Sequence, residues 1–555
     1  MEAKIRTLID KVLKEYEKRA NIQLPANFNY DFGLAKDAQM GDFATNVAFK
    51  LARCVKSKPN LIADELVLLI GSEKKQAGKE EFIDRIEVAG NGFINFFLKK
   101  SSLAAILPEV RQKDKHFGES DFGKGRKVLL EFVSANPTGP LTIAHGRQAA
   151  VGDSLARILQ KTGHKVLREF YLNDAGRQIK LLGQSLWVRY CEQFGMEVAL
   201  PDDGYRGEYL RDLAKKLAGE KKDGLLKMEE LKAVAFCQDY AKNAMMDTIA
   251  DDLKEIRVVF DNYFSESTLY KKETVSETLE NLKKKNHLYE KEGALWFRST
   301  DFGDDKDRVV KKSTGEYTYL APDIAYHRNK FERGYQWLIN LWGPDHHGYI
   351  VRLKAACQAL GHPGEDVEIR IVQLTTLYRK GEPVRMSTRA GEFVTLKELM
   401  DEVGVDATRF FFIMRKVESP LDFDLDLAKQ KSDENPVFYL QYAHARISSI
   451  LKFADQPVTA DARLDLLSTP EEIELIKMIA EFPKALVQAS QMLEPYRLAD
   501  YLRDLATGFH KFYAMHRVVT EDRELTQTRL LLVDGVRITL RNGLECLGIS
   551  QPESM

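Results

Sequence analysis

The chain has 555 residues, of which 44% are hydrophobic, 30% charged and 10% aromatic, and its 82 Lys plus Arg are balanced by 83 Asp plus Glu. This globular composition excludes a disordered, collagen-like or fibrous chain, and the formal net charge of −1 excludes nucleic-acid binding through a general basic excess. At about 150 residues per domain, the length predicts about three or four domains.

Membrane and secretion signals are not found in the sequence. No stretch approaches the ~18 consecutive apolar residues of a membrane-spanning helix, and the first residues form a charged amphipathic pattern without the apolar centre of a signal peptide. We therefore expect a cytoplasmic protein. The cysteines are scattered without any Cys-x-x-Cys pair, so neither a disulfide framework nor a zinc knuckle is predicted.

The first part of the chain mixes helix and strand signals. Residues 42–56 carry apolar side chains at helical spacing, Pro59 is placed to open the next helix, and residues 82–98 indicate strands around a Gly-Asn-Gly turn. We therefore predict a small α+β domain over residues 1–112. A polar stretch with several glycines follows and is interpreted as a linker.

Residues 113–405 alternate strand and helix signals. Residues 127–134 form an apolar run of buried-strand length, a Pro/Gly loop leads into a helix, and residues 165–172 and 337–342 indicate further strands. Strands that alternate with crossover helices predict a Rossmann-like, doubly wound parallel sheet. The charged, helix-rich stretch between the two halves is interpreted as an insertion.

The last third of the chain changes to helical periodicity. Thr395 and Glu398 fit a capping box, which predicts a helix start. Residues 406–434 are assigned to a connecting stem segment, and residues 435–555 are predicted to form an α-helical bundle.

The segment from Glu131 to Arg147, EFVSANPTGPLTIAHGR, lies where the first strand of the sheet ends and a helix begins. In an open α/β sheet this edge is the usual ligand site, and a helix N-terminus presents free N–H groups and a positive dipole end to phosphate. His145 is expected beside that phosphate. Taken alone, a strand, a loop and one histidine are more often structural than catalytic.

A second segment, VRMSTRAGEFVTLKEL, starts at Val384 and follows a late strand of the predicted sheet. Arg385 and Arg389 flank Ser387, and two such cations can fold over a triphosphate and stabilise the charge of departing pyrophosphate. A solvated basic turn is the alternative interpretation.

Together the two segments resemble the HIGH and KMSKS signatures of class I aminoacyl-tRNA synthetases, and the whole chain resembles the arginyl-tRNA synthetase family. The collinear motifs that carry the resemblance are NPTGPLTIAHGRQAAVGD, EFYLNDAGRQI, YRGEYL, STGEYTYLAPDIAYH, WGPDHHGYIVRLKAA, VGVDATRFFFIMR, NPVFYLQYAHARI and LRNGLECLGISQPESM. Both signatures are altered, because Thr142 and Ala144 replace the first histidine and the glycine of one, and Arg385 and Thr388 replace the lysines of the other.

The resemblance implies ligation of L-arginine to its tRNA through an arginyl-adenylate, with ATP and Mg²⁺, no tightly bound metal and a monomeric state. The catalytic residues that it implies are His145, Thr142, Arg385, Ser387 and Arg389. For arginine binding it implies Glu131, Ser134, Asn136, Tyr319 and Asp323, with Glu131, Asp323 and Tyr319 around the guanidinium and Asn136 near the α-amino group. Around ATP it implies Pro137, Gly139, His145, Gly146, His346, His347, Val384 and Met386. The altered signatures leave a catalytically inactive tRNA-binding paralogue as the alternative.

Residue chemistry supports an arginine site, since a planar guanidinium is best met by buried carboxylates. Asp323 follows a proline, however, and capping of a local turn is its alternative role. Asp174 lies in the next strand–helix unit, where we expect either ordinary helix capping or contact with a substrate, with neither role preferred. His346 and His347 lack a third ligand at metal spacing, so no zinc site is predicted.

The resemblance also implies that residues 1–112 contact tRNA and that the C-terminal helices bind its anticodon side. From residue 436 onward there are 13 Lys plus Arg against 16 Asp plus Glu, so recognition must be local. Aromatic rings that stack on splayed bases, with arginines on phosphates, are the expected mode. The candidates, each of which can equally be a core residue, are Tyr439, Tyr442, His444, Arg446 and Tyr513.

Overall fold

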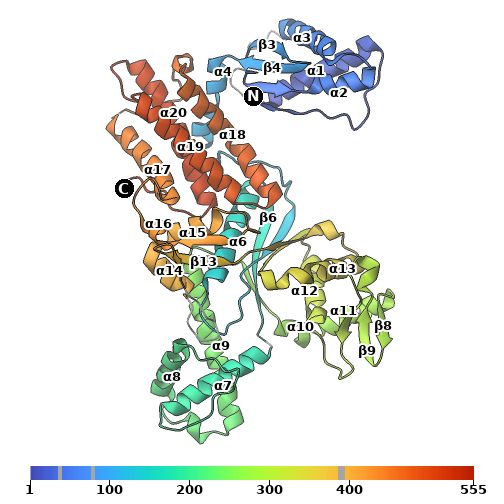
Figure 1. Ribbon diagram of the computed structural model, residues 1–555, viewed down its shortest axis with the longest axis vertical. Helices are drawn as coiled ribbons and strands as arrows, with labels where there is room; N and C mark the ends of the chain where they lie inside the picture. The colour runs from blue at the N-terminus through green and yellow to red at the C-terminus, as the bar shows by residue number, and fades with distance from the viewer. Residues whose placement is uncertain (1, 36–39, 77–81, 175, 385–393, 455) are drawn as a thin grey trace. The chain divides into compact units, whose positions relative to one another are not determined.

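The computed structural model describes residues 2–35, 40–76, 82–174, 176–384, 394–454 and 456–555 (Figure 1). Two compact units can be distinguished. The first contains Met1–Asp114, Ile450–Ala480 and Gly508–Val536, and the second contains Lys115–Ser449, Glu481–Thr507 and Arg537–Met555.

The N-terminal part of the chain is an α+β fold, as predicted. Its elements are α1 (Glu2–Ala20), β1 (Phe32–Leu34), β2 (Phe43–Thr45), α2 (Val47–Val55), α3 (Pro59–Gln76), β3 (Ile83–Ala89), β4 (Phe93–Leu98), α4 (Lys100–Ala104) and α5 (Ile106–Lys113). The strands form an antiparallel sheet in the order β1-β2-β4-β3. The helix expected from residue 42 begins only at Val47, because Phe43–Thr45 pair with strands on both sides.

A five-stranded parallel sheet in the order β12-β11-β5-β6-β7 forms the centre of the second unit. Its strands are β5 (Lys127–Glu131), β6 (Lys165–Leu172), β7 (Asn262–Ser265), β11 (Trp337–Trp342) and β12 (Val367–Ile371). Helix α6 (Ile143–Lys161) crosses from β5 to β6, and α13 (Ile350–Leu360) crosses from β11 to β12. The doubly wound sheet predicted from the sequence is therefore confirmed, with its switch point at β5 and β11.

The first strand is shorter than its apolar run. It ends at Glu131, because Val133 and Ser134 have φ angles of 67° and 43° and turn the backbone away from the sheet. A β-branched residue in this left-handed region is strained, and such strain persists where the surrounding structure requires it.

The stretch between the two halves of the sheet is helical, as predicted, but it also contains strands. It consists of α7 (Arg177–Glu192), α8 (Glu208–Lys221), α9 (Glu230–Glu255), β7, α10 (Ser267–Lys271), α11 (Thr274–Lys284), β8 (Leu288–Lys291), β9 (Ala294–Phe297), β10 (Arg308–Lys311) and α12 (Leu320–Glu332). Helix α7 packs against α8 and α9 around its own apolar core (Figure 1). The strands are four residues long and only partly buried, so their sequence pattern is weak.

A separate three-stranded sheet in the order β14-β13-β15 follows the parallel sheet along the chain. Its strands are β13 (Thr375–Arg379), β14 (Glu382–Pro383) and β15 (Leu421–Asp424). The helices of this stretch are α14 (Leu396–Val403), α15 (Val405–Ile413) and α16 (Leu425–Lys429). The capping box predicted for Thr395 and Glu398 is present at the start of α14, where each side chain bonds to the other residue's backbone N–H.

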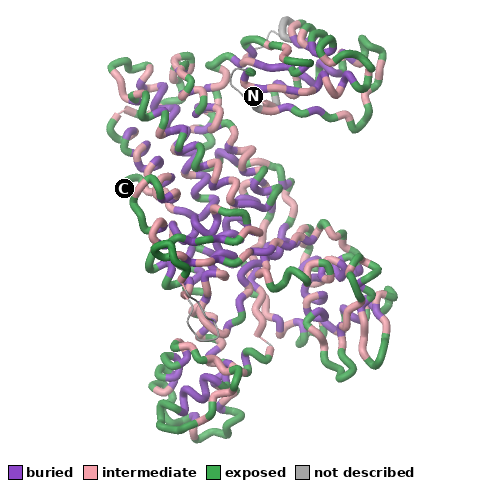
Figure 2. Tube along the Cα trace, viewed as in Figure 1, coloured by how far each residue is buried: buried purple, intermediate pink, exposed green. Residues whose placement is uncertain are grey.

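The remaining chain is helical, as predicted, and consists of α17 (Pro436–Phe453), α18 (Pro470–Met492), α19 (Tyr496–Met515) and α20 (Arg523–Cys546). Each helix carries buried apolar side chains along its length (Figure 2). Among the described residues, no helix combines the length and the apolar character that crossing a bilayer requires.

A fully buried ion pair joins α6 to α15 in the second unit. Arg409 donates to Asp153 Oδ2 at 2.7 Å, and neither residue is exposed to solvent. The same guanidinium donates to the carbonyls of Leu547 and Ile256 at 3.0 and 2.7 Å. A Cβ at Gly548 would lie 2.2 Å from Arg409, so the chain requires glycine where it passes this side chain. The buried guanidinium therefore connects four segments.

We expect Arg409→Met to lower the free energy of unfolding by about 2–5 kcal/mol, because the carbonyls of Leu547 and Ile256 lose their buried donor and Asp153 keeps only the partly exposed Arg157 and Arg168 as cations. Equilibrium urea unfolding measures the loss. Arg503→Met is the matched control, since the Arg503–Asp500 pair is exposed and contributes at most about 1 kcal/mol. Equal stability of the two variants would contradict this role of Arg409.

Candidate active site

A polar cluster lies where the strands of the parallel sheet end. Glu131 is the last residue of β5, Tyr171 lies near the end of β6, and Glu266 directly follows β7. Helix α12 adds Asp323 to this group. We call Glu131, Glu266 and Asp323 the carboxylate cluster. Carboxyl ends of parallel strands meet at one edge of the sheet, which explains why residues so distant in sequence converge.

Glu131 is already paired with a cation. Its Oε2 accepts from Lys330 Nζ at 2.5 Å, and the Lys330 side chain is completely buried. Lys330 Nζ also donates to Asn340 Oδ1 on β11 at 2.9 Å, and Ser134 Oγ donates to Glu131 Oε1 at 3.2 Å. The charge of Glu131 is therefore balanced inside the protein.

The other two carboxylates of the cluster have tyrosines as partners. Tyr349 donates to Asp323 at 2.7 Å, and Tyr270 donates to Glu266 at 3.2 Å. In the part of the chain that the structure describes, no lysine or arginine forms an ion pair with either carboxylate. The pKa of Asp323 is raised to about 7, chiefly by burial and also by the nearby charges of Glu131 and Glu266, although the Tyr349 hydrogen bond opposes this rise. Burial also raises the pKa of Glu266.

Sequence reasoning missed Glu266, and the structure explains how it is held. Asp174 accepts from the Ser265 hydroxyl at 2.7 Å and from the Ser267 N–H at 3.0 Å, on either side of Glu266. Asp174 therefore holds the start of α10 from a distant part of the sequence, whereas the N-cap of the helix that follows Asp174, α7, is Gly176. The only signal in the sequence was a carboxylate placed just after a possible strand.

The first signature forms the N-terminus of α6. Thr142 is the N-cap residue, and its N–H donates to His145 Nδ1 at 3.2 Å. Because an N–H can only donate, Nδ1 accepts, and the neutral ring carries its proton on Nε2. Burial lowers the pKa of His145 to about 4, so the ring is neutral at pH 7. His145 therefore offers an Nε2–H donor.

Close packing fixes Gly146 in the same turn of α6. A Cβ there would lie 2.6 Å from Leu396 Cδ1 on α14. In the preceding loop Pro137 is buried, and the Tyr209 hydroxyl beside Gly139 donates to the Thr138 carbonyl at 2.6 Å. Asn136 is exposed and donates to Gln178 at 2.7 Å.

The second signature lies largely outside the described residues, and this applies to Arg385, Met386, Ser387 and Arg389. Its described flanks adjoin the first signature. Val384 N–H donates to Leu377 on β13, whereas Thr395 forms a β-bridge with Thr142 and the Leu396 N–H donates to Leu141 at 2.8 Å. The end of the second signature segment is thus anchored beside the N-cap of α6.

The remaining predicted residues are more exposed. His346 and His347 are exposed on a turn after β11, and the His346 ring lies 5.7 Å from that of Trp342. Tyr319 is the N-cap of α12 and is 84% exposed, so it does not join the carboxylate cluster. Among the described residues, no group of three or more His, Cys, Asp or Glu side chains is arranged to hold a metal.

The C-terminal candidates differ in burial. His444 is buried and Nδ1 lies 2.9 Å from the Pro552 carbonyl, which favours its core alternative. Arg446 lies over the Tyr442 ring at 4.4 Å, and the Tyr439 hydroxyl is 3.5 Å from Thr507. Tyr513, in the other unit, is 37% exposed.

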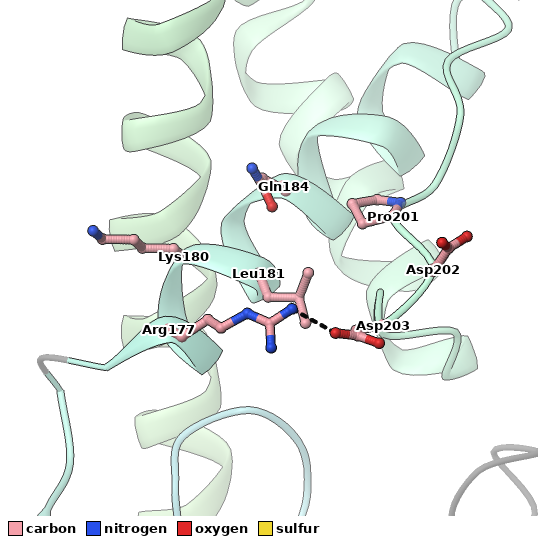
Figure 3. A pocket seen from close by; sticks show the side chains of 7 residues that line it. All are labelled: Arg177, Lys180, Leu181, Gln184, Pro201, Asp202 and Asp203. Atoms are coloured by element: carbon pink, nitrogen blue, oxygen red, sulfur yellow. Dashed lines mark hydrogen bonds and ion pairs between the residues drawn. The ribbon is translucent and has the colours of Figure 1, made fainter. Parts of the chain in front are cut away.

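Figure 3 shows a cavity in the helical insertion, about 480 Å³ in volume. Arg177 on α7 forms an ion pair with Asp203 across it at 2.5 Å. None of the predicted site residues lines this cavity.

Three family models match the chain. They are the "Arginyl tRNA synthetase N terminal domain" over residues 3–98, "tRNA synthetases class I (R), catalytic domain" over residues 106–418, and the "DALR anticodon binding domain" over residues 440–555.

Relatives named arginine–tRNA ligase are similar to this chain over nearly its full length. Arginine–tRNA ligase of Desulfosudis oleivorans is 49% identical over 522 residues, which cover 93% of each chain. The ligase of Shouchella clausii is 49% identical over 524 residues, 94% of this chain and 93% of the relative. The fold matches arginyl-tRNA synthetase of Thermus thermophilus with a TM-score of 0.76 over 100% of both chains, at 23% identity.

The parallel sheet, with a signature helix after its first strand, and the matched catalytic model define a class I aminoacyl-tRNA synthetase. The chain belongs to the arginyl-tRNA synthetase family, and its activity is ATP-dependent arginine–tRNA ligation. The resemblance, the fold class and the activity expected from the sequence are confirmed. The domain boundaries and the roles of individual site residues stay predictions.

The raised pKa of Asp323 predicts a pH-dependent cost to stability. Between pH 3.8, the ordinary pKa of an Asp carboxyl, and about 7, the unfolded chain loses this proton while the folded protein keeps it. Stability falls by about 1.4 kcal/mol for each pH unit within this window. Asp323→Asn removes that cost. The Tm of this variant minus the Tm of the unchanged protein should therefore be larger at pH 8 than at pH 5. An equal difference at both pH values would contradict the raised pKa of this carboxyl.

Proposed function

We propose that arginine–tRNA ligation takes place at the carboxyl edge of the parallel sheet, in two steps. The arginine carboxylate attacks the α-phosphorus of ATP and displaces pyrophosphate, and a ribose hydroxyl of the terminal tRNA adenosine then accepts the arginyl group from the adenylate. Phosphoryl chemistry of this kind needs positioning and charge stabilisation rather than a protein nucleophile. The observation that carries the proposal is a pair of carboxylates, half-buried Asp323 and buried Glu266, that accept from tyrosines and form no ion pair among the described residues.

The guanidinium of arginine is proposed to bind between Asp323 and Glu266. Its five donors form a planar fork that two carboxylates can satisfy, whereas a lysine ammonium cannot span them. Tyr349 holds Asp323 and Tyr270 holds Glu266 through hydrogen bonds, so the two acceptors are oriented before the substrate arrives.

The α-ammonium group is proposed to bind at the β5 end of the site. Glu131 lies there beside Ser134, and its charge is already balanced by Lys330. This revises the expected contact of Glu131 with the guanidinium. Together with Asn136, Glu131 would direct the substrate carboxylate towards α6. Tyr319 remains a proposed contact of the bound amino acid.

ATP is proposed to bind at the N-terminus of α6. The Nε2–H of His145 and the free N–H groups of the first turn are donors suited to phosphate oxygens, and the helix dipole favours the negative charge there. Thr142 adds a hydroxyl in place of the usual first histidine. The other residues proposed around ATP are Pro137, Gly139, Gly146, His346, His347, Val384 and Met386. Mg²⁺ is proposed to enter with ATP, held by its phosphates.

Arg385, Ser387 and Arg389 keep their proposed role at the leaving pyrophosphate. Contacts with tRNA are proposed for residues 1–112 and for Tyr439, Tyr442, Arg446 and Tyr513. We also propose that the protein acts as a monomer in the cytoplasm.

We expect Asp323→Asn and Glu266→Gln each to lower kcat/KM for arginine. The loss of transition-state stabilisation should be about 2–5 kcal/mol, because each variant leaves a guanidinium donor without its charged acceptor. Steady-state aminoacylation over a range of arginine concentrations measures the effect. Glu332→Gln is the control, because Glu332 is an exposed carboxylate of the same helix. Unchanged arginine kinetics in both test variants would remove this assignment of the guanidinium.

Arg385→Ala should lower kcat of the activation step by about 10²- to 10³-fold, the usual loss for one preorganised charge donor. Single-turnover formation of the adenylate is the measurement. Thr388→Lys restores a cation at the matched position and should partly rescue Arg385→Ala. Full activation by both Arg385→Ala and Arg389→Ala would contradict a pyrophosphate clamp on this segment.

A further inference from the structure

One face of α12 carries a chain of buried polar groups that ends at the carboxylate cluster. Asp323, His327 and Lys330 are four and three residues apart and therefore lie on the same side of the helix. His327 Nδ1 is 2.9 Å from the Asp323 carbonyl, and His327 Nε2 is 3.3 Å from Asn340 Nδ2. The chain continues from Asn340 Oδ1 to Lys330 Nζ and then to Glu131.

The direction of each hydrogen bond in this chain is determined. The Asp323 carbonyl can only accept, so His327 Nδ1 carries the proton and Nε2 accepts from the Asn340 amide. Burial holds the pKa of His327 well below its usual range, so the ring stays neutral and Nε2 remains an acceptor. Asn340 must then turn its oxygen to Lys330, which fixes the ammonium against Glu131.

Each of two buried carboxylates near Lys330 forms an ion pair with its own cation. On β6, Glu169 accepts from both Arg333 Nη atoms at 2.5 and 2.7 Å and from the Tyr326 hydroxyl at 2.7 Å. Lys330 balances Glu131 on β5 and lies 4.2 Å from the centroid of the Tyr326 ring.

Asp323 is surrounded by groups from several elements. Glu131 on β5, Glu266 after β7, Tyr171 on β6 and Tyr349 before α13 face it, as does Lys330 on its own helix. The charge of Lys330 lowers the pKa of the Asp323 carboxyl, whereas Arg352 lies farther out, over the Tyr349 ring. The site therefore holds three carboxylates and one internal ammonium, and two carboxylates are left for the substrate.

We propose that Lys330 is a positioning residue of the arginine site, which sets the charge of the carboxylate cluster so that it accepts one guanidinium. The inference rests on the proposed binding of arginine by Asp323 and Glu266. Lys330 touches neither the substrate nor the reacting atoms, and it acts by balancing Glu131 and by favouring the ionised form of Asp323. Without such a cation, neighbouring like charges suppress one another's ionisation.

The test replaces Lys330 by Met, which has a similar length and no charge. Calorimetric titration of the full-length protein with L-arginine, from pH 6 to pH 9, measures the Kd. Without Lys330, Glu131 and Asp323 together should hold an additional proton at pH 7, so arginine binding at this pH should weaken about tenfold for each pH unit by which full ionisation of the cluster is delayed. Binding should recover towards pH 9. KM for arginine should rise, whereas kcat at saturating arginine and KM for ATP should change little.

The control is Lys354→Met on α13, whose lysine is partly exposed and lies 4.0 Å from Glu368. It should leave the arginine Kd and its pH profile unchanged. Asn340→Leu keeps the Lys330 ammonium but removes the Asn340 oxygen that accepts from it. This variant should also shift the pH profile of the arginine Kd towards higher pH, by a smaller amount than Lys330→Met. This variant carries the test if Lys330→Met does not fold.

A folded Lys330→Met protein with the original Kd and pH profile would overturn the proposal. In a protein that already carries Glu131→Gln, Lys330→Met should shift the pH profile of the arginine Kd less than the Lys330→Met substitution alone does. An equal shift in both proteins would exclude action through Glu131. Failure of the proposed function would look different, because Asp323→Asn would then bind arginine normally.

Discussion

A carboxylate at the end of a buried parallel strand needs a cation, and Lys330 supplies it for Glu131. Removing either partner would leave an uncompensated charge in the interior, which typically costs several kcal/mol. The pair therefore requires α12 to lie with its polar face towards β5 and β11. The same packing brings Asp323 beside Glu266. The proposed substrate site is thus a consequence of how the protein satisfies its own buried charges.

Helix α6 is held by a comparable constraint. Asp153 pairs with Arg409 inside the second unit, and a Cβ at Gly152 would lie 2.4 Å from the Phe132 ring. The helix consequently packs tightly against the turn that follows β5. That turn contains Val133 and Ser134 in left-handed conformations, and Val133 N–H donates to Gln148 Oε1 on α6 at 3.2 Å. Strain at the end of β5 and tight packing of α6 together place the first signature beside Glu131.

The sequence predicted the architecture well where the signals were long. Strands 165–172 and 337–342 match the structure, and the capping box at Thr395 is present. Strand 127–134 was predicted too long, because left-handed residues after Glu131 are invisible to an apolar pattern. The short strands β8, β9 and β10 were missed because half-buried runs of four residues give little periodicity.

The site was only partly predictable. Glu131, Asp323 and His145 lie in motifs and were identified, but Glu266 follows a four-residue strand, and its role depends on tertiary contacts. Lys330 looks like an ordinary charged residue of a polar helix, since sequence pattern does not reveal that its side chain is completely buried. Pairing of Glu131 with Lys330 changes the charge of the site, and residue type alone could not reveal it.

The most direct test of this account is a crystal structure of the protein with bound L-arginine. The account predicts guanidinium nitrogens within about 3 Å of the Asp323 and Glu266 carboxylates, with Lys330 Nζ still on Glu131. A guanidinium bound to Glu131, with the Lys330 ammonium displaced from that carboxylate, would contradict it.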